Sequence, residues 1–171
     1  MPISGVSIPK NSVDDVLKAM RALEKIELLV GIPSDDETHL GDDPGPNART
    51  DGPATNALIG YVQNYGSPAR NIPARPFMEP GIANGMPKAE PYLKAAATAA
   101  TGGDLGRAER NIMAAGLVLQ GAVRLEITEG DFAPLAPATI AARRRAGQQG
   151  ELRPLIVSGQ LRRSVSFVIR K

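Results

Sequence analysis

The chain has 171 residues, no cysteine and a net charge of +2, and only 4% of its residues are aromatic. This length suits one domain over residues 1–171 with extensions, and Ala, Leu, Ile and Val must supply most of its core. The lack of cysteine excludes disulfides and thiolate metal sites and fits a protein made in a reducing cytoplasm, and no window approaches the roughly 20 apolar residues of a membrane helix. The small net charge conceals two segments of opposite charge: residues 34–55 carry a net charge of −5, and residues 140–171 carry a net charge of +7.

The N-terminal part of the sequence predicts a helix followed by a strand. Ser12 is a suitable N-cap, and apolar residues then recur at helical spacing to about residue 25. Alternating apolar residues predict a strand over residues 27–32. Residues 33–53 form an acidic, Gly- and Pro-rich extended arm. Its residues cannot bury enough apolar surface to order the arm in an isolated monomer. Either a neighbouring subunit holds this arm or it folds back on its own domain.

The segment 61–81 is the most distinctive part of the chain. Residues 54–65 predict a helix that stops at Gly66, and Pro73 and Pro76 then favour an extended backbone. Such a segment loses little entropy when it is ordered. Arg75 can pair with a carboxylate and Phe77 can fill a pocket, so we interpret the segment as a docking element. The alternative is a surface loop in which Phe77 caps the core of its own chain.

Two longer helical patterns follow. Residues 77–101 are rich in helix formers but contain Pro87 and Pro91, which predicts a kinked helix or one that starts near Pro87. Asp104 can cap a helix that continues through about Thr128. Alanine and glycine on the faces of this helix allow close helix contacts.

The C-terminal quarter predicts a short basic helix over residues 139–146 and a C-terminal arm over 147–171. Apolar residues alternate from Val165 to Ile169, which indicates a terminal strand. That strand can pair with residues 27–32. The predicted fold class is therefore α+β, with a small antiparallel sheet packed by several helices and with long loop and terminal arms.

The sequence contains no motif that points to an enzyme. There is no nucleophile elbow and no phosphate loop. The only histidine, His39, lies in the acidic arm without the ligand spacing of a calcium loop or a second histidine for zinc. We therefore predict no catalytic, cofactor or metal site, and paired-carboxylate chemistry is the enzymatic alternative that stays open.

The basic C-terminal segment offers a second kind of surface. Its clustered arginines can neutralise nucleic-acid phosphates, but the interleaved aromatic residues typical of single-strand binders are absent. A solvated or salt-bridging face is the default interpretation, and the acidic arm of another copy is the matching protein partner. The residues concerned are Arg143, Arg144, Arg145, Arg162 and Arg163.

Two blocks, residues 56–82 and 133–171, together resemble one protein family. They contain an aromatic-Gly-Ser element at Tyr65, the PARPF element over 73–77, and PLIVSGQLRRS over 154–164. In these elements the chain resembles the tail-completion, or neck, proteins of long-tailed bacteriophages and related prophages.

The resemblance implies a non-enzymatic virion protein between head connector and tail tube, made in the host cytoplasm and assembled as a ring of six around the DNA channel. Implied partners are further copies, head connector or stopper proteins and the tail terminator or tail tube protein, with non-specific contact to genomic DNA and none to membranes. The alternatives are a tail terminator that stops tube polymerisation and a small DNA-binding protein. The implied interface residues are Tyr65, Arg75, Pro76, Phe77 and Leu161.

Overall fold

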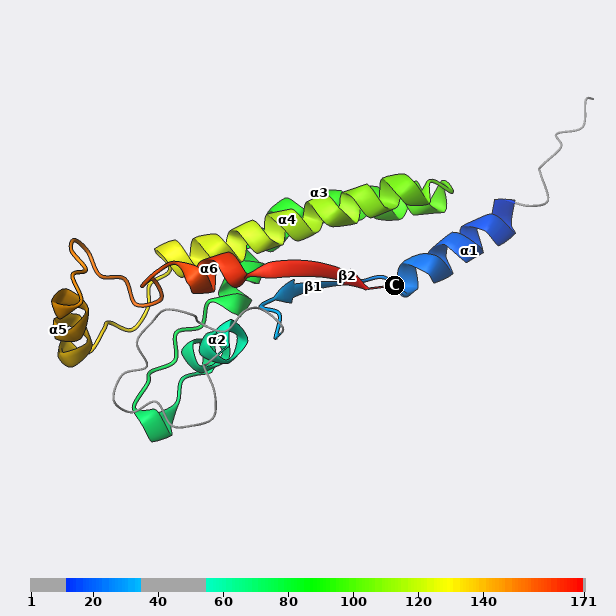
Figure 1. Ribbon diagram of the computed structural model, residues 1–171. Coiled ribbons are helices and arrows are strands. Elements are labelled where there is room, and N and C mark those ends of the chain that lie inside the picture. Colours follow the sequence, from blue (N-terminus) through cyan, green and yellow to red (C-terminus); the bar gives the residue numbers. More distant parts are fainter. Residues whose placement is uncertain (1–11, 35–54, 171) are drawn as a thin grey trace, which may run out of the picture.

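The computed structural model describes residues 12–34 and 55–170, which form an elongated α+β structure (Figure 1). The helices are α1 (Ser12–Glu24), α2 (Asn56–Tyr65), α3 (Met78–Thr101), α4 (Leu105–Glu129), α5 (Pro137–Arg145) and α6 (Gln160–Ser164), with a 3-10 turn over Pro68–Arg70. The strands are β1 (Glu27–Gly31) and β2 (Ser166–Arg170). The predicted fold class is confirmed, whereas the acidic arm lies outside the described residues except for its first two positions.

The sheet brings β1, from the N-terminal part of the chain, beside the C-terminal strand β2 and alongside α4 (Figure 1). Strand β1 pairs antiparallel with β2, with Val30 opposite Phe167, so the pairing expected for residues 27–32 is confirmed. The ring of Phe167 lies against Gly116 of α4, where a Cβ would be only 2.5 Å from the ring. Each strand has a single partner in the described part of the chain, so the outer edge of each strand is open.

Two predicted helix boundaries are confirmed by local contacts. Asp104 accepts a hydrogen bond from the backbone N–H of Arg107 at 2.8 Å and caps α4. Gly66 ends α2 with φ of 79°, and a Cβ there would lie 2.9 Å from the carbonyl oxygen of Ile72. Glycine is required at this stop by both its positive φ and the close approach of the following chain.

Helix α3 is continuous although it contains Pro87 and Pro91. Both prolines are exposed, so water can reach the carbonyl groups that lose their helical hydrogen bonds. The alternative in which this helix starts near Pro87 is therefore wrong.

Helices α3 and α4 pack closely because small residues line the α3 face of the contact. Gly81, Gly85 and Ala89 are buried four residues apart. A Cβ at Gly81 would lie 2.7 Å from the Cα of Val123, which is backbone and cannot rotate away. The close helix contacts expected from the sequence therefore depend on this stripe of α3.

Replacing Gly81 with alanine is expected to destabilise the protein by about 1–3 kcal/mol, because the added methyl group pushes α3 away from α4. Gly121 of α4 is the matched control, since a Cβ there meets no atom within 4 Å in the part of the chain that the structure describes. The change Gly121→Ala should instead stabilise the helix by about 0.5–1 kcal/mol. Urea denaturation of both variants checks the pair, and equal effects would contradict this packing.

The larger core cluster lies where α2, α4 and the C-terminal segment meet. Its buried members come from distant parts of the chain and are joined by partly buried side chains such as Ile59 and Phe132. The start of β2 is tied to α4, because Gln120 and Arg124 both donate to the carbonyl oxygen of Val165, at 2.7 and 2.8 Å. The cluster consists of Phe77, Val123, Ile127, Leu155, Leu161 and Val165.

Candidate assembly surface

Asn64, at the end of α2, caps the start of α3. The first residues of α3 have no capping side chain of their own, because Phe77 occupies the N-cap position. The buried Asn64 side chain replaces it: its Oδ1 accepts from the backbone N–H groups of Phe77 and Met78, at 2.9 and 3.1 Å. Its Nδ2 donates to the Glu79 carboxylate at 3.1 Å. These bonds fix α2 against α3 and satisfy donors that the helix leaves open.

Glu79 then positions Tyr65. The Tyr65 hydroxyl donates to the Glu79 carboxylate at 2.9 Å. Hydrogen bonds from Asn64, from a backbone N–H and from Tyr65 lower the pKa of Glu79, whereas the Glu79 carboxylate raises the pKa of Tyr65. Glu79 is therefore an anion beside a neutral phenol at neutral pH.

An exposed apolar ridge runs along α2. Tyr61 is 63% exposed and Tyr65 58%, and their ring centroids are 5.0 Å apart. Leu58 precedes them on the same face at helical spacing and is also exposed. We call Leu58, Tyr61, Tyr65 and the adjacent Glu79 the α2 ridge. Aromatic side chains of this kind are frequent anchors of protein interfaces.

Arg75 lies inside the protein, where it is 5% exposed. Its Nε donates to the carbonyl oxygen of Ala133 at 2.8 Å, its Nη2 to that of Pro134 at 3.1 Å, and its Nη1 to the side chain of Gln63 at 3.1 Å. Burial lowers its pKa. Arg75 therefore joins α2 to the loop after α4 and does not present its guanidinium group to a partner.

The interface expected around the PARPF element needs correction. Phe77 is 1% exposed in the larger core cluster, and Leu161 is buried in the same cluster. The docking interpretation is wrong for Arg75, Phe77 and Leu161, and the alternative in which Phe77 caps its own core is right. Tyr65 and Pro76 are exposed and stay accessible to a partner.

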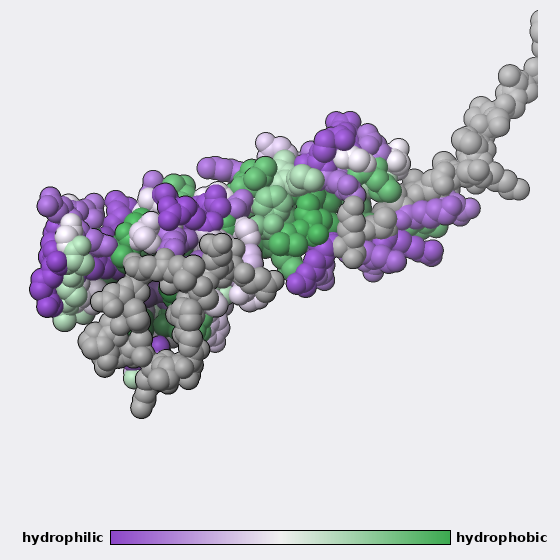
Figure 2. Space-filling view, viewed as in Figure 1, coloured by the Kyte–Doolittle hydropathy of each residue, from purple (hydrophilic) through white to green (hydrophobic). Residues whose placement is uncertain are grey.

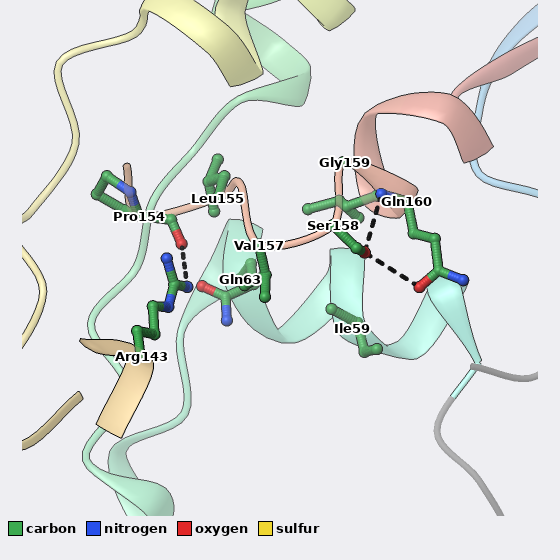
Figure 3. Close-up of a pocket in the computed structure, with 10 residues that line it drawn as sticks. Ile59, Gln63, Arg143, Pro154, Leu155, Val157, Ser158, Gly159 and Gln160 are labelled. Carbon is green, nitrogen blue, oxygen red and sulfur yellow. Dashed lines mark hydrogen bonds between the residues drawn. The ribbon is translucent and has the colours of Figure 1, made fainter. Parts of the chain in front are cut away.

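The five arginines singled out from the sequence fall into two groups. Arg143 of α5 is half-buried and donates to the carbonyl oxygens of residues 153, 154 and 156, at 2.8, 3.2 and 3.1 Å. Figure 3 shows it closing one end of a cleft between α2 and residues 154–160, with Gln63 beside it. Arg144 and Arg145 are exposed and donate to nearby carbonyl groups. Arg143 and Arg144 brace the C-terminal segment, which the sequence did not indicate, whereas Arg145 bonds only within α5 in the described part of the chain.

Arg162 and Arg163 form the second group, beside α4. With Arg124 they line a hollow of about 340 Å³ that also reaches Gly121 and Leu125. Both side chains are exposed, and they form no ion pair with a carboxylate in the described part of the chain. This hollow is therefore strongly basic.

The outer face of α4 is apolar, which sequence analysis missed. Met113, Leu117 and Leu125 are exposed at intervals of four and eight residues, and Gly121 lies between the two leucines. We call these four residues the α4 ridge. Figure 2 shows apolar side chains gathered over the middle of α4 and the adjoining sheet. A second hollow, of about 400 Å³, flanks the ridge on its α3 side.

Within residues 12–34 and 55–170, no three acidic or histidine side chains come together as metal ligands would. None of the helices in these ranges has the length and apolar character needed to cross a membrane. Comparison with protein-family models, with curated proteins and with solved structures found no match for this chain.

Proposed function

We propose that the chain is a structural protein of a bacteriophage neck. It completes the tail and joins it to the DNA-filled head as a homo-oligomeric ring around the DNA channel. The residues at 65–67, 73–77 and 154–164 support this proposal through their resemblance to neck proteins. The ring would contact head connector or stopper proteins on one side and the tail terminator or tail tube protein on the other.

The structural observation that carries the proposal is the amount of apolar surface left uncovered on an elongated molecule. The α2 ridge and the α4 ridge are both exposed, and within residues 12–34 and 55–170 the sheet has two open edges and an exposed Leu29–Val168 pair on its outer face. Monomeric proteins rarely leave such patches and edges open, whereas subunits of an assembly cover them with neighbours.

Electron microscopy of particles made without this protein tests the function. We expect free DNA-filled heads together with free tails of normal length, and expression of the protein in trans should restore joined particles. Overlong tails would instead identify a tail terminator. Normally joined particles would overturn both assignments.

Filter binding across salt concentrations distinguishes a neck protein from the alternative, a small DNA-binding protein. The candidate DNA-binding residues are the exposed Arg144, Arg145, Arg162 and Arg163. A protein that neutralises several phosphates shows a steep fall of affinity with salt. A neck protein with only incidental channel contacts should bind duplex DNA weakly at physiological ionic strength.

A further inference from the structure

The α4 ridge contains a hollow suited to a projecting side chain. Gly121 has no side chain, and a Cβ placed there meets no described residue within 4 Å. Leu117 and Leu125 stand one helical turn to either side of it, and hollows of about 400 and 340 Å³ adjoin the same position. The floor is therefore apolar. Its α6 side carries three arginines, whereas its α3 side carries Lys88, Glu126 and Glu129, so an incoming carboxylate is favoured on the α6 side only.

The α2 ridge has the opposite shape and charge. Tyr61 and Tyr65 project from α2 as a pair of exposed rings, and the Glu79 carboxylate lies at the edge of Tyr65. Tyrosine combines a large apolar face with a polar tip, which suits a partly wet interface. No residue of the α2 ridge lines either hollow beside α4, so the two surfaces are separate on one molecule.

Charge complementarity favours contact between these two surfaces. Arg162 and Arg163 have no carboxylate partner in the described ranges, whereas Arg124 is held against its own chain by hydrogen bonds from its Nη2 to the carbonyl oxygens of Arg163 and Val165. A carboxylate that arrives with an aromatic pair would supply an acceptor, and arginine also stacks on aromatic rings. Among the described residues, Glu79 accepts hydrogen bonds from neutral groups only, so these partners do not neutralise its charge.

We propose that the α2 ridge of one copy docks into the Gly121 hollow of the α4 ridge of the next copy. The inference rests on the proposed self-assembly and identifies the surfaces that meet. Contact between unlike surfaces is head-to-tail, and it closes a ring when the rotation between copies permits. A two-fold contact between two α4 ridges would leave the α2 ridge exposed to water, whereas the head-to-tail contact covers both.

Single cysteines test this contact cleanly, because the chain has none of its own. Leu58→Cys marks the edge of the α2 ridge and Leu125→Cys marks the α4 ridge, and both positions are exposed. The control is Ala138→Cys, which is exposed on α5 away from both ridges. The variants are mixed in pairs and treated with a short bis-maleimide linker, and the products are separated by denaturing electrophoresis.

We expect linked dimers from the mixture of Leu58→Cys and Leu125→Cys, and none from either variant alone or from mixtures with the control. Adding Tyr61→Ala should weaken self-association at least about tenfold, as loss of an aromatic anchor does. Linkage of Leu125→Cys to itself would overturn the proposal in favour of the two-fold contact. Absence of linkage would also overturn the proposed contact, whether light scattering shows oligomers or monomers. The neck function is tested independently, by microscopy of the particles.

Discussion

The change Phe77→Ala is expected to lower the free energy of unfolding by about 3–5 kcal/mol. Phe77 is 1% exposed and shares its cluster with Leu161 and Val123, so truncation leaves a cavity between α2, α4 and the C-terminal segment. Chemical denaturation of the purified variant measures the loss. The matched control is Tyr61→Ala, which removes an exposed aromatic ring and, at a protein concentration low enough to keep the chain monomeric, should cost less than about 1 kcal/mol.

The expected instability changes how assembly experiments with this residue are interpreted. A failure of Phe77→Ala particles to join heads to tails would reflect loss of the fold and would not locate a docking site. Positions of the α2 ridge are the informative ones, because they can be changed without opening the core. A Phe77→Ala variant with wild-type stability but no assembly would contradict the buried position and restore the docking interpretation.

Local patterns were sufficient to predict much of the fold. Alternation of apolar residues predicted the two strands, which can pair and do so in the structure, and Asp104 and Gly66 were identified as helix boundaries from their residue types. Continuity of α3 through Pro87 could not be predicted, since it depends on which face of the helix meets water.

The surfaces were predicted less well, and for a physical reason. An extended segment with an arginine and a phenylalanine looks the same whether its pocket belongs to a partner or to its own chain. The answer depends on contacts with residues far along the sequence, such as Ala133 for Arg75 and Leu161 for Phe77. The capping role of Asn64 could not be predicted, because a side chain that caps another helix has no fixed sequence separation from the residues it caps.

The α4 ridge, by contrast, did leave a signal in the sequence. The buried face of α4 includes Ala108, Ile112, Ala115 and Leu119. Leu117 and Leu125 lie outside that face, eight residues apart with Gly121 midway. A second apolar stripe on a helix that already has a buried one indicates a second contact, and its partner must come from outside the described core.

Replacing Arg75 with alanine is expected to cost about 2–4 kcal/mol, because it removes the packing of a buried side chain and leaves three partly buried acceptors without donors. The acceptors are the carbonyl groups of Ala133 and Pro134 and the side chain of Gln63. Arg75→Lys should recover only part of the lost stability, since one ammonium group cannot reproduce the several N–H donors that the planar guanidinium group holds in fixed directions. Arg145→Ala is the control: its guanidinium group is exposed and makes a single 3.4 Å bond to a neighbouring carbonyl, so the change should stay within about 0.5 kcal/mol.

Arg75 donates to carbonyl and amide oxygens in the structure, an arrangement that we call the carbonyl clamp, whereas the sequence suggested that it pairs with a carboxylate. The pH dependence of the stability lost in Arg75→Ala distinguishes the two arrangements. A carboxylate paired with arginine has a lowered pKa, so its contribution is present at neutral pH and is lost as the pH falls through that pKa. Carbonyl and amide oxygens do not titrate in this range. The difference in unfolding free energy between wild type and Arg75→Ala should therefore be the same at about pH 7 and about pH 4. A difference that shrinks on acidification would contradict the clamp and indicate an acidic partner for Arg75.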